Sequence, residues 1–173
     1  MMKEPIEKAF NEQINAETFS AYLYWSMSAW FETMNLSGAA AWMRAQAQEE
    51  MVHAMKFFHH INERGGTVKL TAIEAPQTEW DSPLAAFEAA YKHEQYISQR
   101  IDDLVTLARE QKDYACESML QWFTDEQVEE EASVDQIVQQ LKLSKEAPGA
   151  LFMIDRELGQ RSFTPPPAEG EGE

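Results

Sequence analysis

Four long stretches of this sequence are nearly free of glycine and proline, and they limit the chain to few folds. The seven glycines and seven prolines gather between these stretches or at their ends. The interiors are rich in Ala, Glu, Gln, Met and Leu, which favour helix over strand. The expected helices run from Glu4 to Thr33, Ser37 to just before Gly65, Ser82 to Gln111, and Asp113 to Leu141. The sequence therefore predicts an all-α protein.

The lengths of the connections predict how these helices are arranged. Only a few residues join the first helix to the second and the third to the fourth, as in antiparallel hairpins. The segment from Gly65 to Asp81 is about seventeen residues long, enough to travel the full height of a bundle. We therefore expect an antiparallel four-helix bundle with a long crossover between its second and third helices.

A short fifth helix is expected after the bundle. Ser144 can cap it, Pro148 would lie early in it, and its apolar stripe is Leu151, Ile154 and Leu158. The bundle and this helix form one predicted domain over residues 1–162. Residues 163–173 are rich in proline, glycine and glutamate, so we expect a disordered tail.

The charge of the chain excludes some classes of partner. Lys and Arg total 14 against 30 Asp and Glu, a net charge of -16, which repels nucleic acid and anionic membranes and favours cations. A single cysteine, Cys116, cannot form an intrachain disulfide, which fits a reducing compartment. The N-terminus has no apolar leader segment, and no stretch is long and apolar enough to span a bilayer. We expect a cytoplasmic protein, or an organellar one if a transit peptide has been removed.

Every helix of the predicted bundle carries ligand-type residues on its apolar face. Steps of three and four residues place one glutamate in the stripe of the first helix and one in the stripe of the third. The second and fourth helices each carry a pair three residues apart. These inward-facing residues are Glu17, Glu50, His53, Glu94, Gln127 and Glu130.

Their spacing predicts that they meet at one level. The interval from Glu17 to Glu50 is 33 residues, and the interval from Glu94 to Gln127 is also 33. The midpoint of each interval falls beside the turn of its hairpin, and residues equidistant from such a turn lie at equal height. Two hairpins related by a pseudo-two-fold axis therefore bring all six side chains to one layer of the core.

Such a layer requires neutralisation. An isolated ionised carboxylate in an apolar core is costly, and several in one layer repel each other. No Lys or Arg lies on the four stripes near this layer. Metal cations are the remaining neutralisers, and a carboxylate-rich set with one imidazole suits iron or manganese. The sequence thus favours two metals bridged by a carboxylate.

At these residues the sequence resembles a non-haem ferritin of the bacterial type, from the first helix through the short fifth one. Gln127, Val128, Glu129 and Glu130 stand where bacterioferritins carry a Glu-x-x-His motif, so the fourth helix favours the ferritin type. The resemblance implies two irons per subunit. Glu17, Glu50 and His53 would hold the first, and Glu50, Glu94 and Glu130 the second, with Gln127 close by.

The resemblance also implies a third iron site at Glu49, Glu126 and Glu129, although these acids fit a solvated helix face as well. It makes Tyr24 the tyrosine beside the centre, able to hydrogen-bond a ligand or donate an electron, although packing explains it almost as well. Met51 lies where bacterioferritins carry a haem-ligating methionine. Packing at an interface is the favoured interpretation of Met51, and haem is not expected.

The function implied is iron storage and detoxification. Fe(II) would be oxidised by dioxygen or hydrogen peroxide at the di-iron centre, making the protein a ferroxidase, and Fe(III) would be stored as mineral inside a hollow shell of 24 subunits. One alternative is a bacterioferritin-like or other di-iron oxidase without a storage role. Another is a bundle that serves only assembly or cation buffering, without catalysis.

Overall fold

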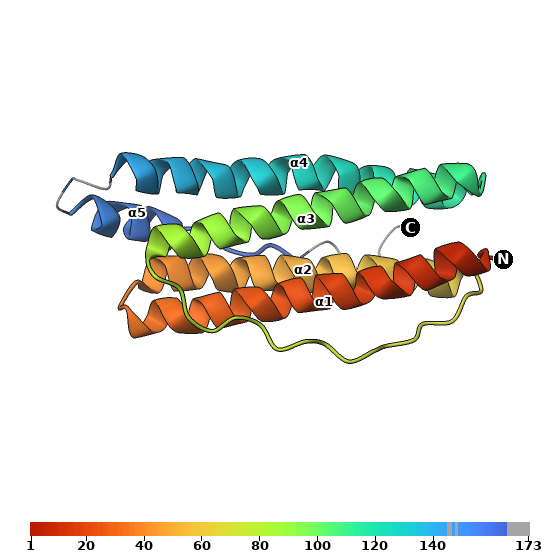
Figure 1. The fold of residues 1–173 in the computed structure, drawn as a ribbon, viewed down its shortest axis with the longest axis horizontal. Coiled ribbons are helices and arrows are strands. Elements are labelled where there is room, and N and C mark those ends of the chain that lie inside the picture. The colour runs from red at the N-terminus through yellow and green to blue at the C-terminus, as the bar shows by residue number, and fades with distance from the viewer. Residues whose placement is uncertain (145–146, 148, 166–173) are drawn as a thin grey trace, which may run out of the picture.

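The computed structural model describes residues 1–144, 147 and 149–165, and its described residues form five α-helices and no strand (Figure 1). The all-α prediction is confirmed. The helices are α1 (Glu4–Thr33), α2 (Ser37–Glu63), α3 (Pro83–Glu110), α4 (Tyr114–Leu143) and α5 (Ala150–Leu158). The first four begin and end within two residues of the predicted bounds.

The four long helices form the predicted antiparallel bundle. α1 packs against α2, α3 packs against α4, and α1 also contacts α3. The crossover between α2 and α3 runs the length of the bundle along α1 (Figure 1). Asn11 and Asn15 of α1 form hydrogen bonds with the first part of the crossover, and Asn11 Nδ2 donates to the Thr67 carbonyl at 3.0 Å. Further along, Ser26 Oγ donates to the carbonyl of Gln77 at 2.6 Å.

Local capping explains where α3 and α4 begin. Ser82 Oγ accepts a hydrogen bond from the backbone N–H of Ala85 at 3.1 Å, and Pro83 occupies the first turn. Asp113 Oδ1 accepts from the backbone N–H of Cys116 at 3.3 Å. Each cap satisfies an N–H that the first helical turn leaves without a partner.

The expected start of the fifth helix is wrong. Ser144 is the C-cap of α4, and its backbone N–H bonds the Gln140 carbonyl at 3.0 Å. α5 begins instead at Ala150, after Gly149, whose φ of 84° is a left-handed conformation that glycine adopts without strain. Pro148 lies outside the described residues, as do residues 166–173 of the expected tail.

α5 packs against the start of α2 at very close range. A Cβ at Gly38 would lie 1.6 Å from the carbonyl oxygen of Asp155, so only glycine permits this approach. The carboxylate of Asp155 in turn accepts from the backbone N–H of Ala39 at 2.8 Å. α5 therefore supplies the N-terminal cap that α2 lacks in its own sequence.

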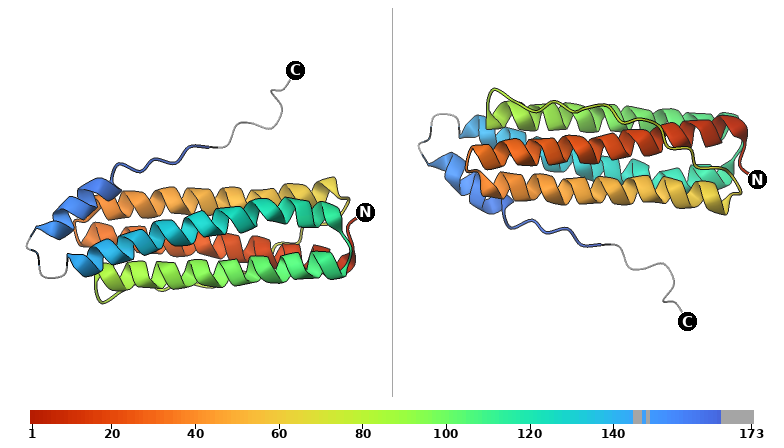
Figure 2. Two further views of the ribbon diagram at one scale, coloured as in Figure 1. Left: turned by 90° about the horizontal axis from the view of Figure 1, so that it is seen from above. Right: turned by 90° about the horizontal axis from the view of Figure 1, so that it is seen from below.

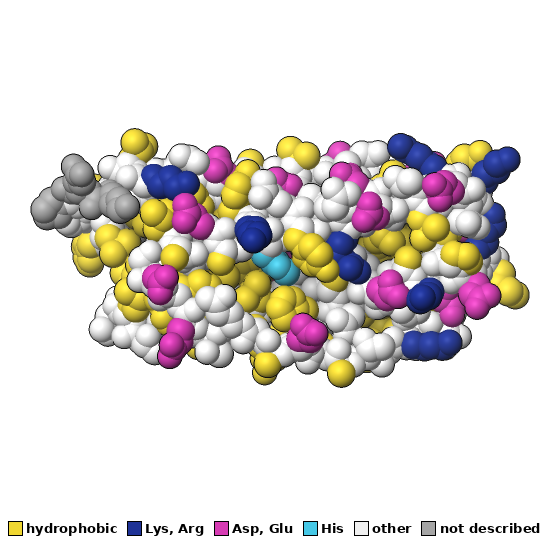
Figure 3. Space-filling model, in the orientation of Figure 1, with side chains coloured by type: hydrophobic (Ala, Val, Ile, Leu, Met, Phe, Trp, Pro, Cys, Tyr) yellow, Lys and Arg dark blue, Asp and Glu magenta, His cyan; other side chains and the backbone are white. Residues whose placement is uncertain are grey.

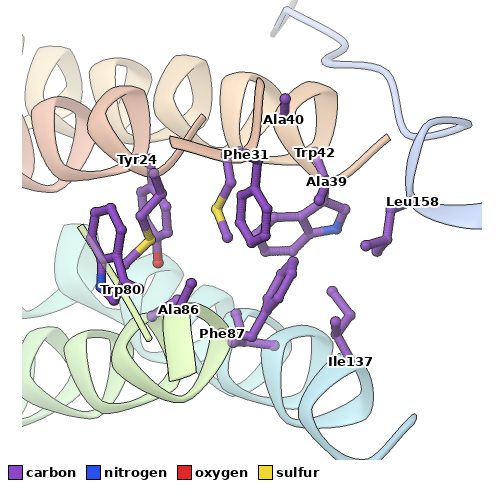
Figure 4. Close-up of a cluster of buried hydrophobic side chains, with 14 of the residues drawn as sticks. Tyr24, Phe31, Ala39, Ala40, Trp42, Trp80, Ala86, Phe87, Ile137 and Leu158 are labelled. Atoms are coloured by element: carbon purple, nitrogen blue, oxygen red, sulfur yellow. The ribbon is translucent and has the colours of Figure 1, made fainter. Parts of the chain in front are cut away.

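Two apolar clusters fill the two ends of the bundle. The cluster beside α5 includes Phe31, Trp42 and Phe87 (Figure 4). The cluster at the opposite end includes Phe10 and Phe57. Along each long helix, the inward-facing residues named from the sequence fall between the residues of these two clusters. Among the described residues, no helix has the length and apolar character needed to cross a membrane.

Candidate metal centre

The buried layer between the two apolar clusters contains all six inward-facing residues named from the sequence. None of them exposes more than 4% of its surface: Glu17, Glu50, His53, Glu94, Gln127 and Glu130. α1 and α3 each supply one glutamate, and α2 and α4 supply two residues each. The structure therefore places ligand-type side chains from all four helices in the interior.

Two groups within this layer have ligand atoms close enough to share a cation. One atom each from Glu17, Glu50 and His53 lie within 4.8 Å of one another. The same holds for His53, Glu126 and Glu130. His53 belongs to both groups, so the two sets adjoin.

Two atoms of this layer have no hydrogen-bond partner. They are Glu17 Oε2 and His53 Nδ1, and the latter lies 3.4 Å from Glu50 Oε2 without a hydrogen bond. A buried polar atom without a partner costs free energy, about 1–3 kcal/mol. Carboxylate oxygens and a neutral imidazole are ligands that iron accepts. The donor set and its unpartnered atoms therefore fit a metal ion.

Glu94 is held from two sides by neutral donors. The Tyr24 hydroxyl donates to Glu94 Oε1, and Gln127 Nε2 donates to Glu94 Oε2 at 3.2 Å. Burial, followed by the nearby Glu94 charge, raises the pKa of Tyr24 well above its usual value. The hydroxyl therefore keeps its proton and remains a donor to the carboxylate.

Without a bound metal ion, the layer retains protons at neutral pH. Burial, and next the neighbouring Glu50, raises the pKa of Glu17 and that of Glu94 to about 8 each. Burial also raises the pKa of Glu50 and that of Glu130, with further contributions from Glu130 on Glu50 and from Glu94 on Glu130. A metal ion requires the ionised carboxylates, so its binding releases these protons.

Two arginines reach the layer through glutamines. Gln13 Nε2 donates to Glu17 Oε1 at 2.8 Å, and Arg100 Nε donates to Gln13 Oε1 at 2.8 Å. On α2, Gln46 Nε2 donates to Glu50 Oε1 at 3.0 Å and to Glu130 Oε2 at 2.6 Å. Arg161 Nη1 donates to Gln46 Oε1 at 2.8 Å. Each guanidinium thus fixes the amide orientation that directs an NH₂ group at a carboxylate.

Sequence reasoning missed these two relays because it considered only cations on the four stripes. Arg100 lies one position off the stripe of α3, and Arg161 follows α5. A signal was present nonetheless. Gln13 and Gln46 each precede a glutamate of the layer by four residues, and they are themselves 33 residues apart.

The three acids expected at a third site lie in different surroundings. Glu126 is partly buried and belongs to the group with His53 and Glu130. Glu49 forms an ion pair with Arg161, and burial raises the pKa of Glu49 although that guanidinium opposes the shift. Glu129 is exposed and belongs to neither group. A shared site for these three acids remains a prediction.

Hollows flank the layer on two faces. One of about 480 Å³ lies between α1, α3 and the crossover, with His93 and Arg100 in its wall. Figure 3 shows this face of the molecule, where acidic and basic side chains are interspersed. A larger hollow of about 1030 Å³ lies beside α2 and α4 and includes Met51 and Trp122. The absence of haem at Met51 stays a prediction.

Carboxylates and an imidazole that converge in the core of a four-helix bundle are typical of ferritin-like metal-binding proteins. A family profile described as a ferritin-like domain matches residues 7–144. The chain belongs to this ferritin-like family. The predicted resemblance to bacterial non-haem ferritins is confirmed by the relatives described next.

Similar proteins cover nearly the whole chain. A bacterial non-heme ferritin of Bacteroides fragilis is 44% identical over 161 residues, which is 93% of this chain and all of that protein. One from Escherichia coli O6:H1 is 38% identical over 158 residues, 91% of this chain and 96% of the other. An open-pore ferritin from Archaeoglobus fulgidus superposes with a TM-score of 0.92 at 51% identity, covering 94% of this chain and 100% of that one. An engineered closed form of the same archaeal ferritin superposes with a TM-score of 0.93 at 52% identity, covering 95% of this chain and 100% of that one.

Proposed function

We propose that this protein stores iron and oxidises it, binding two Fe(II) ions per subunit in the buried layer. The observation that carries the proposal is the group of Glu17, Glu50 and His53, whose ligand atoms lie within 4.8 Å of one another between two apolar clusters. Glu94 and Glu130 are buried in the same layer. Membership of the ferritin-like family supports it. No described Lys or Arg lies in the layer itself to neutralise these acids.

In this proposal each of the four long helices contributes at least one ligand to the two irons. Glu17, Glu50 and His53 hold the first Fe(II), and Glu50, Glu94 and Glu130 hold the second, so Glu50 bridges them. Gln127 and Tyr24 keep Glu94 in position by donating to its two oxygens. The raised pKa values of the acids mean that Fe(II) displaces protons as it binds.

The reaction needs two electrons for each molecule of oxidant. Two Fe(II) ions give one electron each, and dioxygen takes both with two protons to become hydrogen peroxide. If hydrogen peroxide is the oxidant, the same two electrons and two protons give two molecules of water. The chain holds the two ions close together, so that both electrons reach one oxidant molecule.

The storage role requires an enclosed space, which one bundle does not supply. We propose a hollow shell of 24 subunits, in which the net charge of -16 per chain attracts Fe(II) and the product Fe(III) collects as mineral. Several aromatic side chains lie exposed on the single chain, among them Trp25 and Trp122, as expected of surfaces that pack against other subunits.

Sedimentation of the iron-free protein at neutral pH, followed by Fe(II) addition in an oxygen electrode, tests this proposal. We expect a large closed particle, rapid oxygen uptake that saturates at two Fe(II) per subunit, and a mineral core on further loading. A stable monomer or dimer, or a particle that never mineralises, would remove the storage role and leave a di-iron oxidase. Oxygen uptake no faster than in buffer would leave only a cation-binding assembly protein.

The variant His53→Ala tests the metal centre within the same assay. His53 is the only nitrogen donor in the proposed ligand set, so its loss should slow rapid Fe(II) oxidation strongly without unfolding the long bundle. His59→Ala is a matched control, because His59 lies on the same helix and lines the hollow beside it. Parent-like oxidation in the His53 variant would show that the ligands are assigned wrongly.

A further inference from the structure

The segment that follows α5 begins a path of hydrogen bonds that enters the metal centre from outside the four long helices. It leaves α5 beside α2 (Figure 2), and its Arg161 lies over the Trp42 ring, 4.4 Å from the ring centre. Arg161 Nη2 donates to the Glu49 carboxylate. Trp42 and Glu49 both belong to α2, so these two contacts hold the guanidinium at a fixed place beside that helix.

Arg161 determines which end of the Gln46 amide faces the buried layer. A side-chain amide has a carbonyl oxygen that accepts hydrogen bonds and an NH₂ group that donates them, and a half-turn of the amide exchanges the two. A guanidinium has only donors, so it pairs with the oxygen, and Arg161 Nη1 donates to Gln46 Oε1 at 2.8 Å. The NH₂ group is thereby directed at the carboxylates of Glu50 and Glu130.

The directed NH₂ group engages one oxygen of each of these carboxylates. Gln46 Nε2 donates to Glu50 Oε1 at 3.0 Å and to Glu130 Oε2 at 2.6 Å. The other oxygen of Glu50, Oε2, lies 3.4 Å from His53 Nδ1, which has no hydrogen-bond partner. The orientation of one amide therefore sets which oxygen of the proposed bridging ligand faces the histidine.

The same arrangement occurs independently on α1. Arg100 Nε donates to Gln13 Oε1 at 2.8 Å, and Gln13 Nε2 donates to Glu17 Oε1 at 2.8 Å. The other oxygen of Glu17, Oε2, is buried without a hydrogen-bond partner. This guanidinium also lies over an aromatic ring, 5.7 Å from the ring centre of Tyr96. An arginine, a glutamine and a glutamate thus follow one another in the same order at two places in the layer.

We propose that Arg161 and Arg100 are positioning residues, which through their glutamines select the carboxylate oxygens that face the two irons. The inference rests on the proposed function, because it concerns the geometry of the two-iron centre. Arg161 acts on the bridging Glu50 and on Glu130, so it influences both irons. Arg100 acts on Glu17 alone, so it influences only the first. The segment after α5 is then a working part of the metal centre.

Positioning and charge predict different results when such an arginine is removed. By its charge alone, a guanidinium near a cation site repels Fe(II), so its loss should favour Fe(II) binding. Loss of a positioning group should instead slow oxidation even when both ions are bound, because the carboxylates no longer hold the ions in the geometry that the reaction needs. The limiting rate of oxidation at saturating Fe(II) therefore separates the two roles.

The test is stopped-flow oxidation of Fe(II) by dioxygen over a range of Fe(II) concentrations. Arg161→Met keeps the length of the side chain and its apolar contact with Trp42, which preserves folding. We expect its limiting rate to fall roughly tenfold without a rise in the half-saturating Fe(II) concentration. Arg161→Lys should recover part of the rate, because an ammonium group still donates a hydrogen bond. Arg100→Met should lose less than Arg161→Met, because only one carboxylate is affected.

Two further variants make the result specific. Arg156→Met removes the same charge from an exposed residue of α5, so its limiting rate should match that of the parent. Gln46→Met removes the amide itself, so adding Arg161→Met to it should slow oxidation no further. A parent-like limiting rate in Arg161→Met, or an equal loss with and without Gln46, overturns the inference. Absence of rapid oxidation in the parent would instead contradict the proposed two-iron centre.

Discussion

The two ends of the bundle and its middle layer are equally buried but chemically opposite. At the end beside α5, Phe31 and Phe87 pack with their ring centres 5.5 Å apart and no exposed surface beyond 1%. In the middle, Glu17 and Glu94 are as deeply buried and carry pKa values raised to about 8. The apolar ends stabilise the fold, and the acids of the middle layer oppose it until a cation neutralises them.

This difference separates stability from function along a single set of helices. Removing apolar atoms from an end should cost stability and leave metal binding in place. Removing an acid from the middle should cost metal chemistry and little stability.

The largest effect is expected from Glu130→Ala. Glu130 is a proposed ligand of the second iron, so the variant should lose the fast phase of paired Fe(II) oxidation while still folding. Glu129→Ala is the matched control, since Glu129 points about 100° away from Glu130 on the helix and is exposed. That control should keep the first fast phase and alter only the iron to oxygen ratio or later turnovers. Stopped-flow absorbance after Fe(II) addition measures the oxidation phases of the two variants. Complete loss of the fast phase in both would contradict the assignment of Glu130, but not Glu129, to the second iron.

Next in size is the loss of a large side chain from an apolar end. Phe31→Ala should lower the free energy of unfolding by about 3–5 kcal/mol, because Phe31 is fully buried. Two tight Fe(II) ions should still bind at temperatures where the variant is folded. Denaturant unfolding measures the free energy of unfolding, and anaerobic titration measures how many Fe(II) ions bind tightly.

Phe152→Ala provides the control for that substitution. Phe152 lies on α5 with 71% of its surface exposed, so its removal should change the free energy of unfolding little. Equal destabilisation by the two variants would mean that the apolar end does not carry the stability assigned to it.

The iron-free protein should lose stability as the pH rises. Glu17 and Glu94 have ordinary pKa values of 4.5 and folded-state values of about 8, so the folded state keeps more protons in this interval. Their contribution is fully present below pH 4.5 and is lost as the pH rises through about 8. The slope is about 1.4 kcal/mol per pH unit for each proton kept. Denaturant midpoints between pH 5.5 and 8.5 measure it, and Glu94→Gln should flatten the curve.

Metal ions should reverse this trend. Because binding displaces protons, Fe(II) binds more tightly as the pH rises and stabilises the protein most where the iron-free form is weakest. A stability curve of the iron-free protein that rises over the same interval would show that the middle layer is already neutralised without metal.

The smallest effect is expected from Tyr24→Phe. The variant loses only the hydroxyl that donates to Glu94, so Fe(II) affinity at the second site should fall about tenfold while the bundle stays folded. Tyr22→Phe is the control, because Tyr22 lies on the same helix and is 47% exposed. Anaerobic titration compares the two, and matching affinities would reduce Tyr24 to a packing role.

The sequence was sufficient to predict the helices because their boundaries depend on local chemistry. Ser82 with Pro83, and Asp113 after its turn, are caps that act within four residues of themselves. The start of α5 was mispredicted because Ser144 suits either end of a helix, and α4 continues to it. The cap of α2 was not predictable locally, since Asp155 comes from α5.

The candidate site likewise has one part that the sequence predicts and another that it does not. Helical periodicity predicts which glutamates face inward, and equal hairpin spacing predicts their common level. Arg100 and Arg161 escape this reasoning because a long side chain can reach the layer from outside the stripe, through Gln13 or Gln46. The 33-residue spacing indicates the two glutamines, but the arginines that reach them depend on tertiary contacts.

Anomalous X-ray scattering at the iron edge, from crystals of the protein loaded anaerobically with Fe(II), would locate the metal ions in the bundle. We expect two iron peaks in each subunit, one among Glu17, Glu50 and His53 and the other among Glu50, Glu94 and Glu130. Iron found only at exposed acids, with the buried layer free of anomalous signal, would contradict it.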